Sequence, residues 1–295
     1  MIVPPPLARG DRVVVVAPSG PFDRALVLRG VAWLRERYEV DFGEALFEQR
    51  GYLAGTDERR REELNRAIAD ERARAVVATR GGYGLTRIAH ALDLSPLRTR
   101  PKWLVGFSDV TALHAEASRF GVASIHGHNV AGLGRGDDRA RERWEAVLRA
   151  PTARRRFDSL TVVRGGRATG PVVGGNLTVL FSSAAAGRLV LPEGAVLLLE
   201  DVGEAPYRVD RMLTALLVAG ALDRVAGVLL GSFTDSAPGR YGVPVEEVLA
   251  ERLGELGVPV LAGFPAGHGP ENESVVLGVP ATLDGATASA ELGMD

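Results

Sequence analysis

Ser108 occupies a position in this sequence that favours a nucleophilic serine. It follows the short apolar run 103–105 and Gly106, and helical periodicity begins two residues later at Val110. A serine at such a turn projects beyond the sheet, near the positive end of a helix and near backbone N–H groups that could bind an oxyanion. Val110 stands where the Gly-x-Ser-x-Gly elbow of serine hydrolases has its second glycine, so the pattern is only partial. A serine that simply caps the helix is the alternative.

Five histidines could supply the base that such a serine needs. His268 is the preferred base, because it lies in a glycine-rich loop that suits an imidazole reaching towards a substrate. His90 falls inside a predicted helix, where packing or a surface position is the simpler interpretation. His114 falls in the helix after Ser108, six positions on, so its side chain should lie well round the helix from the serine.

His126 and His128 end a predicted strand and are the rivals of His268. Two histidines at this spacing could also ligate a metal ion, although no third ligand stands at a convincing spacing. The chain has no cysteine, which excludes disulfides, thiolate metal sites and a cysteine nucleophile. No metal or organic cofactor is expected, because a serine and a histidine can perform both half-reactions of a hydrolysis.

Three acids within five positions compete to orient the base. Glu200 follows the apolar run 195–199 directly, so we expect it to be buried and paired with a histidine N–H. Asp201 and Glu204 are the alternatives, and Glu204 is the better candidate for stabilising the N-terminus of the helix that follows.

A glycine-rich loop, Arg80-Gly-Gly-Tyr-Gly84, follows the predicted strand 75–78. Its glycines allow backbone N–H groups to point at a ligand, as an oxyanion hole or a phosphate loop requires. It matches neither the Walker pattern nor the dinucleotide fingerprint, and a tight turn that merely needs glycine is the alternative. Arg80 and Arg87 are both candidates for binding a substrate carboxylate.

The order of predicted elements indicates an α/β protein with a parallel sheet. Predicted strands in the first half are 12–17, 75–78, 103–105 and 123–125, alternating with predicted helices 24–38, 57–69 and 85–92. Residues 150–170 have the composition of a connection, and strands 195–199, 225–230 and 258–261 alternate with helices beyond it. We predict domains at 1–150 and 171–295 joined by a linker, 151–170.

The composition of the 295 residues is that of a soluble protein. The chain is 46% hydrophobic with a net charge of −2, which argues against nucleic acid as a partner, and the arginine runs 59–61 and 154–156 are best explained as solvated surface. No apolar run is long enough to cross a membrane, and the N-terminus lacks the pattern of a signal peptide. A cytoplasmic location is expected.

Several motifs together resemble the serine LD-carboxypeptidase family, which includes microcin C immunity proteins. They are Val-Gly-Phe-Ser-Asp-Val-Thr-Ala-Leu-His (105–114), Arg-Gly-Gly-Tyr-Gly (80–84), Gly-Gly-Asn-Leu (174–177), Leu-Glu-Asp-Val-Gly-Glu (199–204) and Gly-His-Gly (267–269). The resemblance spans nearly the whole chain. It implies a catalytic triad of Ser108, Glu200 and His268.

The resemblance also implies the rest of the site and the fold. Backbone N–H groups of Asp109 and Gly82 would form the oxyanion hole, and Gly81 and Tyr83 would contact the substrate. The implied fold is an N-terminal flavodoxin-like domain with a smaller α/β C-terminal domain, the active site lying between them, in an enzyme that often forms a homodimer.

The implied reaction is removal of the terminal D-Ala from cytoplasmic murein stem tetrapeptides, as part of peptidoglycan recycling. Two alternatives stay open: an immunity-type hydrolase of peptidyl or aminoacyl nucleotides, and a ligand-binding module without catalytic activity. The sequence leaves open the third residue of the stem peptide and the group that binds its carboxylate.

Overall fold

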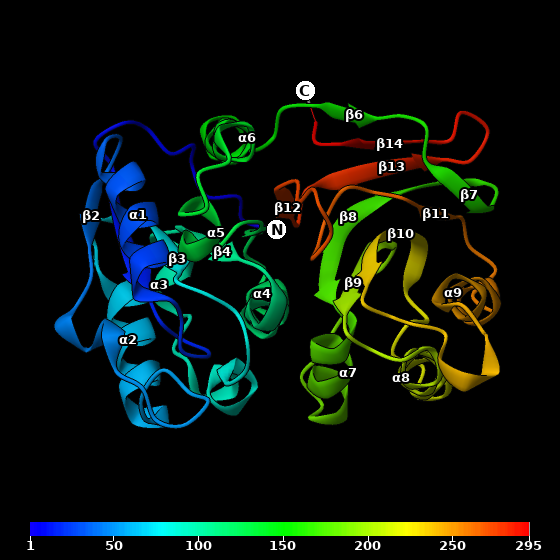
Figure 1. Ribbon diagram of the computed structural model, residues 1–295. Coiled ribbons are helices and arrows are strands. Elements are labelled where there is room, and N and C mark those ends of the chain that lie inside the picture. Colours follow the sequence, from blue (N-terminus) through cyan, green and yellow to red (C-terminus); the bar gives the residue numbers. More distant parts are fainter. Residues whose placement is uncertain (295) are drawn as a thin grey trace. The chain divides into compact units, whose positions relative to one another are not determined.

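The computed structural model describes residues 1–294, which form two compact units (Figure 1). The first unit comprises Met1–Pro151 with Glu273–Val276, and the second comprises Thr152–Asn272 and the residues from Leu277 onward. Asp295, the last residue of the predicted range 171–295, lies outside the described residues.

The first unit is built on a six-stranded sheet in the order β12-β5-β4-β3-β1-β2, and β1 to β5 pair in parallel. The valine and alanine runs of β1 and β3 suit strands that are covered on both faces. This sheet confirms the predicted parallel α/β fold. The strands are β1 (Arg12–Val16), β2 (Glu39–Asp41), β3 (Ala73–Ala78), β4 (Trp103–Gly106), β5 (Ser124–His126) and β12 (Val275–Leu277).

The helices of the first unit begin at recognisable caps. The Asp23 carboxylate accepts a hydrogen bond from the Leu26 N–H, and the Thr56 hydroxyl accepts one from the Arg59 N–H, as N-cap side chains do. The α-helices are α1 (Arg24–Arg35), α2 (Asp57–Ala69), α3 (Pro96–Thr99), α4 (Thr111–Phe120), α5 (Val130–Leu133) and α6 (Asp138–Arg149), and the 3-10 helices are η1 (Glu44–Phe47), η2 (Leu85–Arg87), η3 (Ala89–Ala91) and η4 (Ser108–Val110).

Two details of the first unit differ from the sequence prediction. The predicted helix 85–92 is a pair of 3-10 turns, because Ile88 between them leaves the helical region with φ −121°. In addition, β12 joins the edge of the first sheet from late in the chain, next to β5. Three apolar residues carry too little periodicity to reveal a strand that pairs so far from its sequence neighbours.

The second unit has an eight-stranded sheet in the order β6-β14-β13-β8-β9-β10-β11-β7 (Figure 1). Strands β8 to β11 are parallel, and the flanking pairs are antiparallel. Buried aliphatic side chains of the parallel strands pack on the three α-helices. The elements are β6 (Arg155–Phe157), β7 (Thr161–Arg164), β8 (Arg167–Asn176), α7 (Leu177–Ala185), β9 (Ala195–Val202), α8 (Pro206–Val218), β10 (Val225–Thr234), η5 (Gly239–Tyr241), α9 (Val245–Gly254), β11 (Val260–Ala262), β13 (Pro280–Asp284) and β14 (Ser289–Leu292).

The stretch 151–170, predicted as a linker, is not an irregular connection. It contains β6, β7 and the start of β8. Strands β6 and β7 lie at the two edges of the second sheet and are largely exposed, so they need few apolar residues. Their arginine and glycine content therefore resembled that of a connection.

No helix formed by residues 1–294 combines the length and the apolar character that crossing a membrane requires.

Gly30 tests the packing of α1 on α5. Helix propensity alone would make Gly30→Ala stabilising by about 1 kcal/mol. A Cβ there would lie 2.1 Å from the Val130 carbonyl oxygen, so we expect a loss of about 1–3 kcal/mol in the free energy of unfolding. Urea unfolding measures it. Gly254→Ala in α9 is the matched control, because its Cβ would meet nothing within 4 Å, and it should be neutral or stabilising. Equal behaviour of the two variants would contradict this account.

Candidate active site

Ser108 lies directly beyond the carboxyl end of β4 with a left-handed backbone, φ +66°. Few residues other than glycine adopt this conformation, and such strain is typical of a nucleophile elbow. The cap of η4 is Phe107, and neither η4 nor α4 has a side-chain cap. Ser108 therefore has no capping role. Its side chain lies at the edge of the sheet where the loops follow the strands.

Glycines make room for this turn on both sides. A Cβ on Gly81 would lie 2.7 Å from the Ser108 Cβ and 2.8 Å from its Oγ, so the glycine-rich loop packs directly against the serine. A Cβ on Gly106 would lie 2.6 Å from the Asn129 Oδ1. Cβ atoms essentially never come this close to other atoms, so a side chain at either position would force its neighbours to move.

The predicted oxyanion donors belong to the same loop edge. Gly82 is exposed and has φ +100°, a conformation that glycine adopts without strain. Asp109 follows the serine, and its carboxylate accepts a 2.8 Å hydrogen bond from the Leu85 N–H. The Asp109 side chain thus ties the serine turn to the end of the glycine-rich loop.

Tyr83, predicted to contact the substrate, is exposed in that loop. Its ring centroid lies 5.8 Å from that of Tyr52, with the planes tilted by 53°. The sequence prediction did not include Tyr52. The two rings form an exposed aromatic pair next to Gly81 and Gly82, because Gly20 packs against the backbones of both tyrosines and of Gly81.

His114 is buried in α4 and contacts the backbone that precedes the serine turn. Its Nε2 lies 2.9 Å from the Gly106 carbonyl oxygen, which also accepts a hydrogen bond from the Gly127 N–H. Burial lowers the pKa of His114 to about 3, so the ring is neutral and donates from Nε2. The two bonds fix the backbone two residues before Ser108.

His126 and His128 flank the Phe107 ring, with centroid separations of 5.8 and 6.3 Å. His126 is fully buried, and burial lowers the pKa of His128. Among residues 1–294, no group of three or more His, Asp or Glu side chains is arranged to hold a metal ion. The contacts of these two histidines are those of packed side chains around the serine turn.

In the second unit, the structure brings Glu200 and His268 together. Glu200 is fully buried near the end of β9, a central strand, and its Oε2 lies 2.7 Å from the His268 Nδ1. A buried carboxylate requires a hydrogen-bonded partner, and the imidazole supplies one. With Nδ1–H donated to Glu200, Nε2 becomes the basic nitrogen of His268.

Hydrogen bonds on both sides of His268 hold its loop in place. The Gly267 N–H donates to the Asn272 Oδ1 at 2.9 Å, and the Gly269 N–H donates to the Ser232 Oγ at 2.8 Å. A Cβ on Gly267 would lie 2.6 Å from the Glu200 Oε2, so only glycine lets the loop approach the carboxylate. The loop was predictable from its glycines, but the part played by Ser232 was not.

The two acids that competed with Glu200 have other partners. Asp201 accepts hydrogen bonds from the Asn176 Nδ2 and from the N–H and hydroxyl of Thr178, and burial raises its pKa. Glu204 forms a 3.6 Å ion pair with Arg208 in α8. Only Glu200 among the three contacts a histidine in the described part of the chain.

Each unit therefore holds one group of the residues that the sequence singled out. Ser108, Asp109, Gly81, Gly82 and Tyr83 gather at the carboxyl edge of the first sheet. An oriented acid and base lie near the ends of β9 and β11 in the second unit. The first arrangement can present a nucleophile beside backbone N–H groups, and the second can accept a proton.

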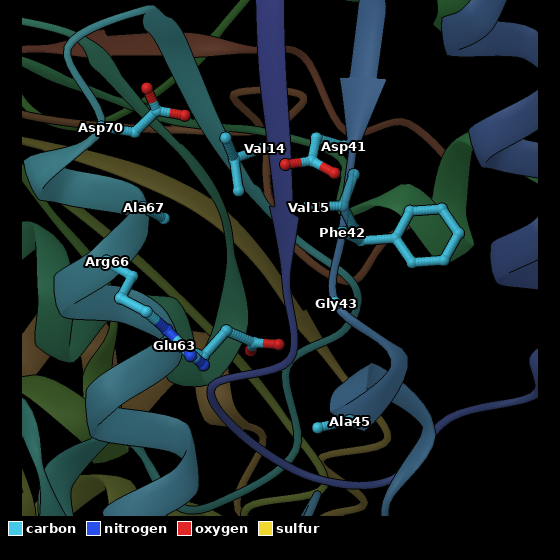
Figure 2. A pocket seen from close by; sticks show the side chains of 10 residues that line it. All are labelled: Val14, Val15, Asp41, Phe42, Gly43, Ala45, Glu63, Arg66, Ala67 and Asp70. Atoms are coloured by element: carbon cyan, nitrogen blue, oxygen red, sulfur yellow. The ribbon is translucent and has the colours of Figure 1, made fainter.

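Two cavities lie elsewhere. One of about 260 Å³ is lined by α2, β1 and the residues after β2 (Figure 2). Its acids are engaged: Glu63 accepts from Arg59 and from the Ala17 N–H, and Arg12 bridges Asp70 and Asp41. The other, of about 480 Å³, lies beside the start of α8 and the segment 237–243. Neither is lined by a predicted catalytic residue.

Comparison with known proteins gives consistent matches along the chain. Residues 13–127 match the model of the LD-carboxypeptidase N-terminal domain, and residues 169–283 match that of the LD-carboxypeptidase C-terminal domain. The murein tetrapeptide carboxypeptidase of Pseudomonas aeruginosa is 34% identical over 287 residues, covering 93% of each chain. The probable murein peptide carboxypeptidase of Bacillus subtilis is 33% identical, covering 99% of this chain and 95% of its own.

Solved structures show the same fold. The muramoyltetrapeptide carboxypeptidase of Oxalobacter formigenes superposes with a TM-score of 0.85 at 27% identity, covering 96% of this chain and 99% of its own. MccF in complex with glutamyl sulfamoyl guanosine superposes with a TM-score of 0.87 at 23% identity, covering 98% of each chain.

The buried Asp109 carboxyl makes stability depend on pH. Burial raises its pKa from 3.8 to about 6, against the hydrogen bond from Leu85, which lowers it. The folded state therefore binds the proton more tightly than the unfolded state. The stabilisation is complete below about pH 4 and is lost as pH rises through 6, and a two-unit shift corresponds to about 3 kcal/mol.

Asp109→Asn keeps an acceptor for the Leu85 N–H and removes this titration. We expect the free energy of unfolding of the wild type, relative to that of the variant, to fall by up to about 3 kcal/mol between pH 4 and 7. Denaturant unfolding at several pH values measures it. Burial also raises the pKa of Glu63. Because Glu63 is present in both proteins, its contribution to the pH dependence cancels in the difference. A difference that does not change with pH would contradict the assignment.

Proposed function

This chain belongs to the LD-carboxypeptidase family, and we propose that it removes the terminal D-Ala from murein tetrapeptides through a triad of Ser108, His268 and Glu200. The observation that carries the mechanism is the 2.7 Å contact between the His268 Nδ1 and the Glu200 Oε2. The left-handed turn of Ser108 beside Gly81 supports the choice of nucleophile.

In the proposed first step, the His268 Nε2 takes the proton of the Ser108 hydroxyl as Oγ attacks the scissile carbonyl carbon. The carbonyl oxygen becomes an oxyanion, which the N–H groups of Asp109 and Gly82 stabilise. His268 then returns the proton to the departing amine of D-Ala, and the acyl group stays on Ser108. Glu200 holds the correct tautomer and stabilises the imidazolium throughout.

The second step repeats this chemistry with water. His268 takes a proton from a water molecule, whose oxygen attacks the acyl carbon, and Ser108 regains its proton as the ester bond breaks. The serine, the histidine and the backbone donors account for both steps, and the proposed mechanism uses no metal or organic cofactor.

The substrate class rests on the relatives. Those named for murein peptides are 33% and 34% identical over more than nine-tenths of this chain. Hydrolysis of a peptidyl or aminoacyl nucleotide is the competing activity, because MccF shares the fold. A cytoplasmic location and a homodimer stay predictions.

Ser108→Ala tests the proposal. The purified protein is incubated with a murein tetrapeptide and, separately, with a peptidyl nucleotide, and mass spectrometry follows release of D-Ala or of the nucleotide. We expect D-Ala release by the wild type and a loss of at least about a thousandfold in kcat for Ser108→Ala. The double variant with His268→Ala should lose no more than the worse single variant, because triad members act as a unit.

Other results would count against the proposal. Nucleotide release without D-Ala release would favour the competing activity. Binding without turnover of either substrate, and no labelling of Ser108 by a serine-reactive probe, would favour a binding module. Retention of more than about a tenth of the activity by Ser108→Ala would exclude it as the nucleophile.

Glu200→Gln tests which carboxylate orients the base. An amide keeps the size of the side chain but cannot stabilise imidazolium, and it favours the wrong tautomer, so kcat should fall by roughly a hundred- to ten-thousandfold. Glu204→Gln is the matched control, since it removes only an ion pair with Arg208, and kcat should change less than about threefold. The two variants are assayed side by side on one substrate. The reverse ranking would move the triad acid to Glu204.

A further inference from the structure

Arg80 is an exposed arginine at the loop edge of the first sheet that has no acidic partner within residues 1–294. Its Nη1 donates a 2.6 Å hydrogen bond to the Pro21 carbonyl oxygen. A carbonyl oxygen orients a guanidinium without neutralising it, so the positive charge and further N–H donors are available to a ligand.

Three arginines of the neighbouring segments already bind carboxylates. Arg59 pairs with Glu63 at 2.7 Å. Arg87 and Arg60 both pair with Asp57, and Arg60 is fully buried as well. The sequence left Arg80 and Arg87 as equal candidates for a carboxylate-binding group, and their contacts separate them.

The guanidinium of Arg80 also lies close to Gly82, a proposed oxyanion donor. Its Cζ is 4.0 Å from the position that a Cβ on Gly82 would occupy, and Gly81, between the two residues, packs against Ser108. The hydrogen bond to Pro21 holds the side chain folded back over Gly82. A fixed positive charge therefore stands next to a proposed oxyanion donor.

We propose that Arg80 binds the C-terminal carboxylate of the peptide and so restricts cleavage to its last bond, an inference that rests on the proposed function. The terminal carboxylate carbon lies one residue beyond the scissile carbonyl carbon, at most about 3.6 Å away. A charge-assisted N–H···O bond adds about 2.8 Å. A guanidinium beside Gly82 reaches the carboxylate while the scissile oxygen occupies the oxyanion hole.

If Arg80 binds the terminal carboxylate, the rate of cleavage should depend on whether the peptide carries that carboxylate. A peptide that ends in a carboxamide, or continues beyond D-Ala, has no anion at this position and leaves the Arg80 charge without its partner. The wild type should therefore prefer the free acid over the matched C-terminal amide, and the preference should depend on Arg80.

The experiment compares kcat/KM for a murein tetrapeptide acid and its C-terminal amide in the wild type, Arg80→Gln, Arg80→Lys and Arg87→Gln. Arg80→Gln should lower kcat/KM for the acid roughly 10- to 100-fold, mainly through KM, because a charged hydrogen bond is lost. It should change the amide less than about threefold. Arg80→Lys should recover part of the preference, and Arg87→Gln, which removes an equal charge from the same edge, should keep it.

Binding provides a readout that does not depend on turnover. In the Ser108→Ala background, calorimetry with the same two peptides should show tighter binding of the acid, and Arg80→Gln should abolish the difference. A preference that survives Arg80→Gln, or one lost equally in Arg87→Gln, overturns the role of Arg80 while leaving the proposed function intact. Hydrolysis of neither peptide by the wild type contradicts the proposed function itself.

Discussion

The left-handed backbone at Ser108 is the constraint on which the loop edge of the first sheet depends. A residue other than glycine in this conformation costs about 1–3 kcal/mol, and it persists only where its surroundings hold it. The surroundings do so from both sides: His114 and the Gly127 N–H fix the Gly106 carbonyl before the turn, and the Asp109 carboxylate binds the Leu85 N–H after it. Two of these contacts are made by buried titratable side chains, His114 and Asp109.

The acid and base in the second unit meet a different physical requirement. A carboxylate that must hold an imidazole in one direction has to be fixed, and a central strand of the sheet provides this because packing leaves its side chains no alternative position. The histidine must approach that strand closely. Gly267 makes the approach possible, since a Cβ there would collide with the Glu200 carboxylate. Glycine thus sets the geometry in both units, by allowing strain to be held in one and close contact in the other.

The parts of the site that follow from local pattern could be predicted from the sequence. The strand-to-helix turn at Ser108, the apolar run that ends at Glu200 and the glycines around His268 are each contained in a few neighbouring residues. Features that depend on distant pairing could not be predicted in this way. Strand β12 and the edge strand β7 take their places from partners far along the chain, and the His114 contact requires the return of α4 onto β4. The sequence could not distinguish Arg80 from Arg87 either, because the ion pair of Arg87 joins it to Asp57, which lies far away in the chain.

The choice between Glu200 and Asp201 shows how a long-range constraint decides a local question. Successive side chains of a strand point to opposite faces of the sheet. Leu197 and Leu199 belong to the core formed with α7 to α9, and Asp201 continues their face, where it binds Asn176 and Thr178 at the start of α7. Glu200 points to the other face and meets His268. A shift of one residue in the register of β9 would exchange the two acids, so the hydrophobic packing of β9 against the helices determines which carboxylate reaches the base.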